Sequence, residues 1–297
     1  MSHSGGESSR EGDAPSFPVR VTLVTIFVYA ALALALIPVA HVPGPQLPGI
    51  IPLFVAGVLF AQLSTGFLLF AWFRKDRTWS LLLLGCAYLY SALMALSHLL
   101  TFPGAILADR PFIAASEQST AWIFVAWTNG FALLTLSATL IEAWFGESRI
   151  VSNRGGHAVA TGLSATVVTV LIVTIAVVKL EMPTLVTQHG FTALSWIVRW
   201  LSVFLLCSSI AIILFVMREP SDLYLWLSWA LSAMVFYTIL SAIGGARFTL
   251  GWSIGRLSWF LSACALFVYF LLQFARQFHS SPKDIASQRD SVKRRKL

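Results

Sequence analysis

ALMALSHLLTFPGAILADRPFIAASEQSTAWIFVAWTNGF, residues 92–131, leaves one apolar segment, crosses a short polar loop and enters a second apolar segment. Pro103 has no N–H and restricts Phe102, and Gly104 permits turn dihedrals, so the sequence predicts a structural turn that ends a helix there. His98 falls in the last turn of that helix. Ionisable side chains in such apolar segments are rare and often functional, so His98 is the first candidate site residue.

The composition is that of an integral membrane protein. The 297 residues are 57% hydrophobic and only 11% charged, whereas soluble domains carry about 25% charged residues. Eleven Trp and twenty-two Phe match the aromatic excess found at membrane interfaces. The formal charge of +7 is therefore interpreted as a topology signal, and no nucleic-acid partner is expected.

Eight apolar runs are each long enough to cross a hydrocarbon core of about 30 Å. They are predicted at residues 21–40, 51–73, 79–100, 121–144, 158–178, 193–216, 223–243 and 257–275. Pro, Gly and charged residues separate them. The predicted fold is therefore all-α, a polytopic integral membrane protein with eight transmembrane helices.

Two polar tails flank the predicted membrane domain of residues 20–275. Residues 1–19 are rich in Ser, Gly and Glu, and their low apolar content predicts a disordered cytoplasmic tail. Residues 276–297 are strongly basic and are predicted to form a short cytoplasmic tail. No output domain is expected there.

The distribution of Lys and Arg predicts the orientation. With eight spans and the N-terminus inside, fifteen basic residues lie on the inner side and four on the outer side. By the positive-inside rule, both termini are predicted to be cytoplasmic. The expected location is the bacterial cytoplasmic membrane.

Signatures of a catalytic domain are absent from the sequence. It contains no phosphate loop, nucleophile elbow, HExxH motif or dinucleotide fingerprint. Cys86, Cys207 and Cys264 lie in separate apolar runs without CxxC spacing, and the histidines lack ligand spacing. We therefore expect no enzymatic activity, no cofactor and no metal site.

Polar and aromatic residues gather in the outer halves of the predicted spans. Because alternate spans reverse direction, these residues lie at a similar depth, and we predict that they form one pocket open to the periplasmic side. The predicted ligand-binding residues are His98, Trp122, Trp127, Asn129, Arg199, Trp252 and Arg256. Aromatic faces and two cationic groups favour an anionic or planar ligand.

Each polar member of this set also has a simpler structural interpretation. Arg199 could anchor its helix at the interface beside neighbouring Trp residues, and Arg256 could mark the membrane boundary at the start of the eighth span. Asn129 could form a hydrogen bond between helices, and His98 could cap its own helix.

Three sequence blocks carry a family resemblance. They are LYSALM with SHLLTFPG at 89–94 and 97–104, QSTAWIFVAWTNGF at 118–131, and RFTLGWSIGR at 247–256. With these blocks the chain resembles the membrane-associated sensor (MASE) domains of bacteria, in particular their fourth class, over roughly residues 20–274. The resemblance implies an eight-span sensory module of the kind usually found N-terminal to a GGDEF diguanylate cyclase or a histidine kinase.

The chain departs from that family pattern at two positions of the second block. The family has a His after the second Trp and a Pro after the Gly-Phe pair, where this chain has Thr128 and Ala132. If the family site needs both histidines, this copy has lost one of them.

The resemblance implies a signal-input domain of cyclic-di-GMP or two-component signalling that lacks a catalytic output domain of its own. Its expected partners are the lipid bilayer and a small ligand on the periplasmic side, and a separately encoded cyclase or kinase is a further candidate. Two alternatives stand beside this interpretation. One is a small-molecule transporter, and the other is a truncated remnant of a diguanylate cyclase or sensor kinase.

Overall fold

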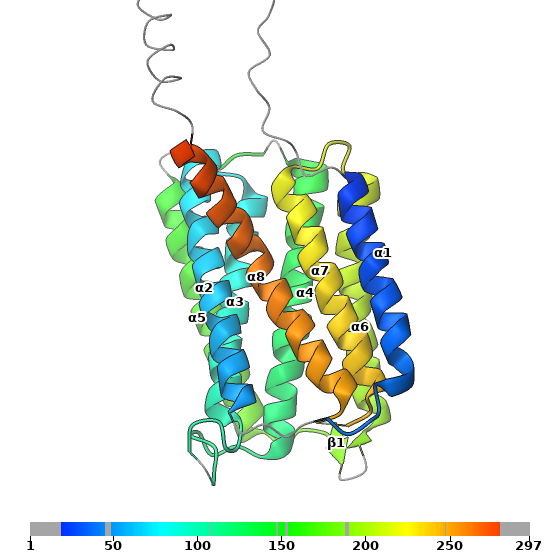
Figure 1. Cartoon of the computed structure of the whole chain (residues 1–297). Coiled ribbons are helices and arrows are strands. Elements are labelled where there is room, and N and C mark those ends of the chain that lie inside the picture. Colours follow the sequence, from blue (N-terminus) through cyan, green and yellow to red (C-terminus); the bar gives the residue numbers. More distant parts are fainter. Residues whose placement is uncertain are drawn as a thin grey trace, which may run out of the picture.

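Eight long helices stand side by side in the computed structural model (Figure 1). The structure describes residues 19–44, 49–107, 109–146, 148–151, 154–187, 190–246 and 248–279. The helices are α1 (Val19–Leu36), α2 (Ile50–Asp76), α3 (Trp79–Thr101), α4 (Glu117–Phe145), α5 (Gly155–Lys179), α6 (Ala193–Ala211), α7 (Asp222–Ile243) and α8 (Leu250–His279). Short helical turns, η1 (Ile37–Val39) and the π-helical η3 (Ile212–Val216), extend α1 and α6. In the described part of the chain, eight helical segments are long and apolar enough to cross a membrane, which confirms the predicted fold class.

The two ends of the bundle differ in structure. The start of α1 and the finish of α8 lie on opposite sides of the same end of the bundle, uppermost in Figure 1, which we call the terminal end. The opposite end carries two short antiparallel strands, β1 (Val186–Thr187) and β2 (Gly190–Phe191), and we call it the hairpin end. The predicted topology assigns the terminal end to the cytoplasm, and this assignment stays a prediction.

The predicted polar tails fall almost entirely outside the described residues. Of residues 1–19 and 276–297, the structure describes only residue 19, which begins α1, and residues 276–279, which extend α8. The predictions for the rest of both tails therefore remain untested.

Helix boundaries follow local chemistry at the two positions that matter for the site. α3 ends at Thr101, after which Phe102 is extended and Gly104 has a φ of 75°, as the Phe-Pro-Gly sequence predicts. The eighth helix begins at Leu250, whereas the sequence predicted 257. The Thr249 hydroxyl accepts a hydrogen bond from the N–H of Trp252 at 3.3 Å and so caps an earlier start.

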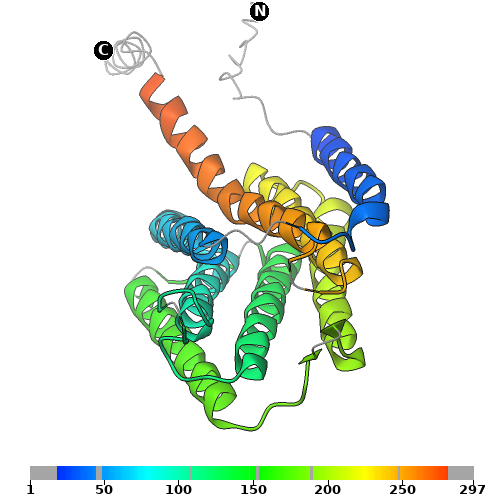
Figure 2. The same cartoon turned by 60° about the horizontal axis from the view of Figure 1, so that its bottom comes forward.

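The packing centre consists of α3 and α7, most of whose residues are buried. α8 packs closely along α7 through serine hydroxyls. Ser258 donates to the carbonyl oxygen of Ala233 at 2.8 Å, and Ser262 donates to that of Ala230 at 2.6 Å. These bonds fix how α8 crosses the bundle from the hairpin end to the terminal end (Figure 2).

α1 is peripheral, and only Thr22 and Ala33 of its described residues are buried. It packs on α7 through Tyr29, whose ring makes edge contacts with Trp229 and Phe236. The segment after it is fastened to the start of α8, because the N–H of Gly44 donates to the carbonyl oxygen of Phe248 at 2.7 Å.

Candidate functional site

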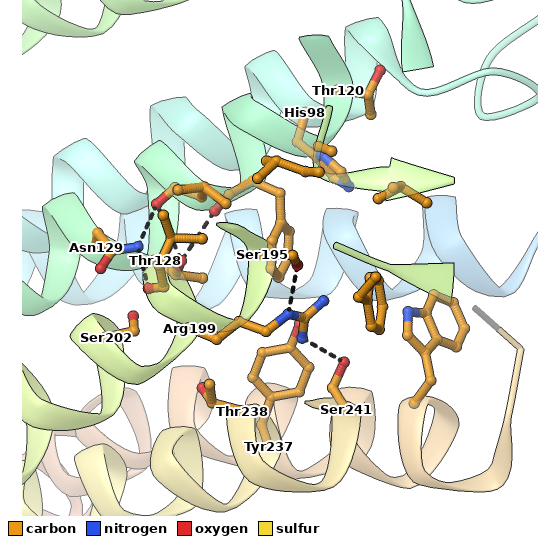
Figure 3. A pocket seen from close by; sticks show the side chains of 18 of the residues that line it. His98, Thr120, Thr128, Asn129, Ser195, Arg199, Ser202, Tyr237, Thr238 and Ser241 are labelled. Carbon is orange, nitrogen blue, oxygen red and sulfur yellow. Dashed lines mark hydrogen bonds between the residues drawn. The ribbon is translucent and has the colours of Figure 1, made fainter. Parts of the chain in front are cut away.

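A cavity of about 70 Å³ lies at the hairpin end, among α3, α4, α6, α7, α8 and the strands (Figure 3). Hydroxyl, amide, guanidinium and aromatic groups line it. The lining residues that bear on its chemistry are His98, Phe124, Asn129, Phe191, Ser195, Arg199, Ser202, Tyr237, Ser241, Trp252 and Arg256. A hollow of this size has room for several water molecules or one small ligand.

The α3–α4 connection sets the position of His98. The Thr120 hydroxyl, in the first turn of α4, donates to the carbonyl oxygen of Thr101 at 2.8 Å. The Ser116 hydroxyl caps α4 by accepting from the N–H of Ser119 at 3.0 Å, as expected for a helix start. These bonds hold the last turn of α3, and with it His98, against α4.

His98 packs among aromatic rings inside the bundle. Its side chain is 3% exposed, and its ring centre lies 5.5 Å from Phe102, 5.6 Å from Phe124 and 6.0 Å from Trp127. The imidazole is therefore part of an aromatic wall of the cavity.

Arg199 reaches into the bundle from α6 (Figure 3). Its Nε donates to the Ser195 hydroxyl and its Nη1 donates to the Ser241 hydroxyl of α7, both at 3.3 Å. The guanidinium also lies 4.0 Å from the ring centre of Phe191 in β2, a cation–π distance. The guanidinium of Arg199 therefore points into the bundle, toward α7 and β2.

Arg256 is surrounded by rings. Its side chain is 9% exposed, and its guanidinium carbon lies 4.7 Å from the ring centre of Trp252, 5.0 Å from Phe54 and 5.1 Å from Phe124. Because α8 begins at Leu250, Arg256 lies within the helix and does not open it as the sequence suggested. Phe124 contacts both Arg256 and His98, so the two residues share one wall.

Hydrogen-bond acceptors lie beside the cations. Asn129 donates through Nδ2 to the carbonyl oxygens of Val125, at 3.1 Å, and of Val198 in α6, at 3.3 Å, so it does form the bond between helices that the sequence allowed. Its Oδ1 and the Ser202 Oγ are buried without a hydrogen-bond partner among the described residues. Burying such groups unpaired is unfavourable, so the cavity presents hydrogen-bonding capacity that a ligand or water can use.

The hairpin closes one side of the cavity and is held by α4. Gln118 donates through Nε2 to the carbonyl oxygen of Val186 at 2.6 Å, and its Oε1 accepts from the N–H groups of Leu185 and Val186. Leu185, Val186 and Phe191 all line the cavity. One side chain therefore fixes the segment that carries part of the lining.

Five of the seven predicted site residues line the cavity: His98, Asn129, Arg199, Trp252 and Arg256. The other two lie beside it. Trp122 donates its indole N–H to the carbonyl oxygen of Pro183 at 2.7 Å, and Trp127 donates to the Ser91 hydroxyl at 2.6 Å from a fully buried position. Both tryptophans hold surrounding structure in place without lining the cavity.

Sequence reasoning missed Phe124, Phe191, Ser195, Ser202, Tyr237 and Ser241. Ser195 and Ser241 sit on the faces of α6 and α7 that turn toward Arg199, and Ser195 precedes Arg199 by one helical turn, a spacing that could have identified it. Phe191 lies in a short strand that no sequence signal marked. Among the described residues, no group of three His, Cys, Asp or Glu side chains could hold a metal ion.

Comparisons with known proteins address the family. Comparison with curated proteins and with solved structures yields no match. Residues 45–277 match the family MASE4, described as "Membrane-associated sensor, integral membrane domain". The matched residues include α2 to α8 and the whole lining of the cavity, whereas α1 lies outside them. The match covers most of a multi-pass membrane protein with eight candidate spans, and the chain therefore belongs to the family of membrane-associated sensors of this integral membrane type.

Proposed function

We propose that this sensor domain detects a small carboxylate that enters the cavity from the periplasmic side. One observation carries the proposal: two guanidinium groups, Arg199 and Arg256, line the cavity, and none of the described lining residues is acidic. Guanidinium groups recognise carboxylates with two parallel hydrogen bonds.

The other groups of the cavity narrow the ligand class. The Asn129 Oδ1 can only accept a hydrogen bond, and the Ser202 hydroxyl can donate or accept one. A ligand that places a carboxylate at the guanidinium groups and a hydroxyl at these atoms would satisfy both. Small hydroxycarboxylates have this chemistry and suit a cavity of about 70 Å³.

α8 offers the route by which binding would be transmitted. It carries Arg256 and Trp259, and the Trp259 ring packs on Trp127 at 4.4 Å and on Tyr237 at 4.8 Å. At the terminal end the same helix packs its Tyr269 against Trp72 of α2. A ligand that binds one arrangement of Arg256 more tightly would shift the position of α8.

We further propose that the domain has no catalytic activity and that it acts on a cyclic-di-GMP or two-component signalling enzyme. No described residues form an acid, base and nucleophile constellation at the cavity. The purified chain should therefore turn over neither GTP nor ATP. Formation of cyclic-di-GMP or autophosphorylation would contradict this part of the proposal.

The binding test uses the full chain in nanodiscs, titrated with glycolate, acetate and the neutral analogue glycolamide, with Trp fluorescence as the readout. Glycolate should bind more tightly than acetate, and glycolamide should not bind. Because hydrogen bonds to charged groups contribute about 1.5–3 kcal/mol, Arg199→Gln should weaken glycolate binding about tenfold or more. Lys179→Gln removes an exposed cation near the same end of the bundle and should leave binding unchanged. Equal binding of glycolate and glycolamide would refute the proposal.

A further inference from the structure

A second hollow lies in the other half of the bundle. It is a groove of about 680 Å³ between α4 and α5, with α3 as its floor. Its lining is almost entirely apolar, with Leu82 and Leu83 on the floor, Leu133 and Leu134 on α4, and Ala165 on α5. The groove shares no lining residue with the cavity at the hairpin end, so the two hollows are separate.

Small residues create the groove. A Cβ at Gly162 would lie 2.9 Å from the Cys86 Sγ, and a Cβ at Gly130 would lie 2.4 Å from the Tyr90 hydroxyl oxygen. α5 therefore approaches α3 closely at Gly162, and Tyr90 of α3 packs against α4 at Gly130. Ala165, which is exposed, leaves the wall between these contacts open toward the lipid.

The groove has the length of one membrane leaflet. Along α5 its lining runs from Ala158 to Thr169, which is about 16 Å at about 1.5 Å per helical residue. The hydrocarbon core is about 30 Å thick, so half of it is about 15 Å. The groove can therefore accept an apolar chain that enters from the leaflet at the terminal end.

Three arginines lie on or beside the connecting segments at the terminal end of the groove. Thr78 pairs with Arg149, and the N–H of Ile150 donates to the carbonyl oxygen of Arg77 at 2.8 Å. Gly155 follows Arg154 at the start of α5, and a Cβ at Gly155 would lie 3.9 Å from the Arg77 Nε. The connecting segments thus bring Arg77, Arg149 and Arg154 to the end of α5 from which the groove begins.

The mouth of the groove also carries an interfacial side chain. Trp79 directly follows the Thr78 cap, lines the groove and is 49% exposed. Tryptophan at the end of a transmembrane helix lies at the level of the lipid headgroups. This places the three arginines at headgroup depth and the apolar lining below them.

We propose that this groove is a binding site for one anionic phospholipid, with an acyl chain between α4 and α5 and the phosphate at Arg77, Arg149 and Arg154. Basic pockets beside transmembrane helices attract anionic headgroups. The apolar lining of the groove would hold the acyl chain in place, whereas other lipid chains exchange freely along the outer surface of the bundle. The charge of the mouth and the leaflet length of the groove select a lipid over a helix of another protein. The proposal does not depend on the ligand or the output of the sensor.

Native mass spectrometry of the full chain in detergent tests this site, with phosphatidylglycerol and phosphatidylcholine added at equal concentration. The wild type should retain phosphatidylglycerol in preference. The double substitution Arg149→Gln, Arg154→Gln should lower its occupancy about tenfold or more. Ala165→Phe, which fills the groove without changing any charge, should lower it to a similar extent.

Two matched substitutions serve as controls. Arg218→Gln removes an exposed arginine at the same end of the bundle but away from the groove, and Val168→Phe enlarges an exposed residue of α5 that does not line it. Both should bind phosphatidylglycerol like the wild type. Equal retention of the two lipids by the wild type would refute the headgroup site. Unchanged retention in Ala165→Phe would refute the groove as the place of the acyl chain.

Discussion

The cavity at the hairpin end and the groove near the terminal end are built in opposite ways from equally apolar helices. The cavity is made by side chains that are present, because Arg199, Arg256 and Asn129 bring polar groups into the bundle. The groove is shaped by small side chains, because Gly162 lets α5 approach α3 closely and the short, exposed side chain of Ala165 leaves space beside that contact. A polar site in a membrane protein is therefore visible in a hydropathy pattern, and a lipid groove is not.

Charged and small residues differ in how often they occur in transmembrane helices for reasons unrelated to a binding site. Charged groups inside a membrane are unfavourable enough that few are kept without a role. Small residues are common at tight helix contacts that leave no space at all. At Gly85, for example, a Cβ would lie 2.9 Å from the Phe70 ring, so this glycine serves close packing. Gly162 also serves close packing, since a Cβ there would lie 2.9 Å from the Cys86 Sγ, yet it borders the groove. Sequence alone cannot show which of these tight contacts has a groove beside it.

The largest expected effect concerns which hollow faces which compartment. With the terminal end in the cytoplasm, alkaline phosphatase fused after Glu181 should be active and the same fusion after Arg154 should be inactive, because the enzyme matures only in the periplasm. Green fluorescent protein fused at the same two sites should give the opposite pattern. Activity after Arg154 would reverse the orientation and place the two-arginine cavity on the cytoplasmic side.

A smaller effect tests whether the contact between Tyr90 and Gly130 sets the distance between α3 and α4 beside the groove. A Cβ at Gly130 would lie 2.4–2.6 Å from atoms of the Tyr90 phenol, whose hydroxyl donates to the carbonyl oxygen of Ala126 at 2.8 Å. Gly130→Ala should lower the free energy of unfolding by about 1–3 kcal/mol, because the added methyl overpacks this contact. Thermal unfolding in detergent, followed by circular dichroism, measures the change.

Gly156→Ala is the matched control for that substitution. Gly156 lies in the first turn of α5, and a Cβ there would meet nothing within 4 Å. Alanine has the higher helix propensity, so the free energy of unfolding should stay the same or rise by up to about 1 kcal/mol. An unfolding free energy in Gly130→Ala as high as in Gly156→Ala would show that Tyr90 moves aside and does not set the distance between α3 and α4.

The sequence was most informative about the spans and the rare polar residues. Eight runs of sufficient length predicted the eight candidate spans, and Phe102-Pro103-Gly104 predicted where α3 ends. Reversal of alternate spans placed His98, Asn129, Arg199 and Arg256 at one depth, and these residues do line one cavity. These inferences succeeded because each depends on a local pattern or on a membrane-wide constraint.

Packing direction was not predictable in the same way. Trp122 and Trp127 lie on the helix that carries Asn129, yet their indoles hydrogen-bond to Pro183 and Ser91 and lie outside the lining. In a chain with many aromatic residues, a tryptophan near a site cannot be assigned to it without knowing which helix stands opposite. Phe191 was missed for a related reason, since its strand is only two residues long.

The smallest expected effect is local opening of the hairpin that closes the cavity, with little change in the stability of the whole bundle. Gln118→Ala removes three hydrogen bonds to the hairpin segment, those with the Val186 carbonyl oxygen and with the N–H groups of Leu185 and Val186. Each such bond contributes about 0.5–1.5 kcal/mol, and the strands of the hairpin are partly exposed. Local opening should become about tenfold more frequent, while the unfolding of the whole bundle changes little.

Hydrogen exchange of the amides at 185–187 and 190–191 measures that opening, and Glu181→Ala, an exposed side chain at the same end, is the control.

The cavity and the groove should respond differently to Gln118→Ala. Freeing the hairpin should loosen the contact between Phe191 and Arg199, which is 4.0 Å in the closed arrangement, and should weaken glycolate binding. It should leave retention of phosphatidylglycerol unchanged, because no residue of the hairpin lines the groove. Unaltered exchange in Gln118→Ala would mean that Phe191 on Arg199, together with the bond from Trp122 to Pro183, holds the hairpin without help from Gln118.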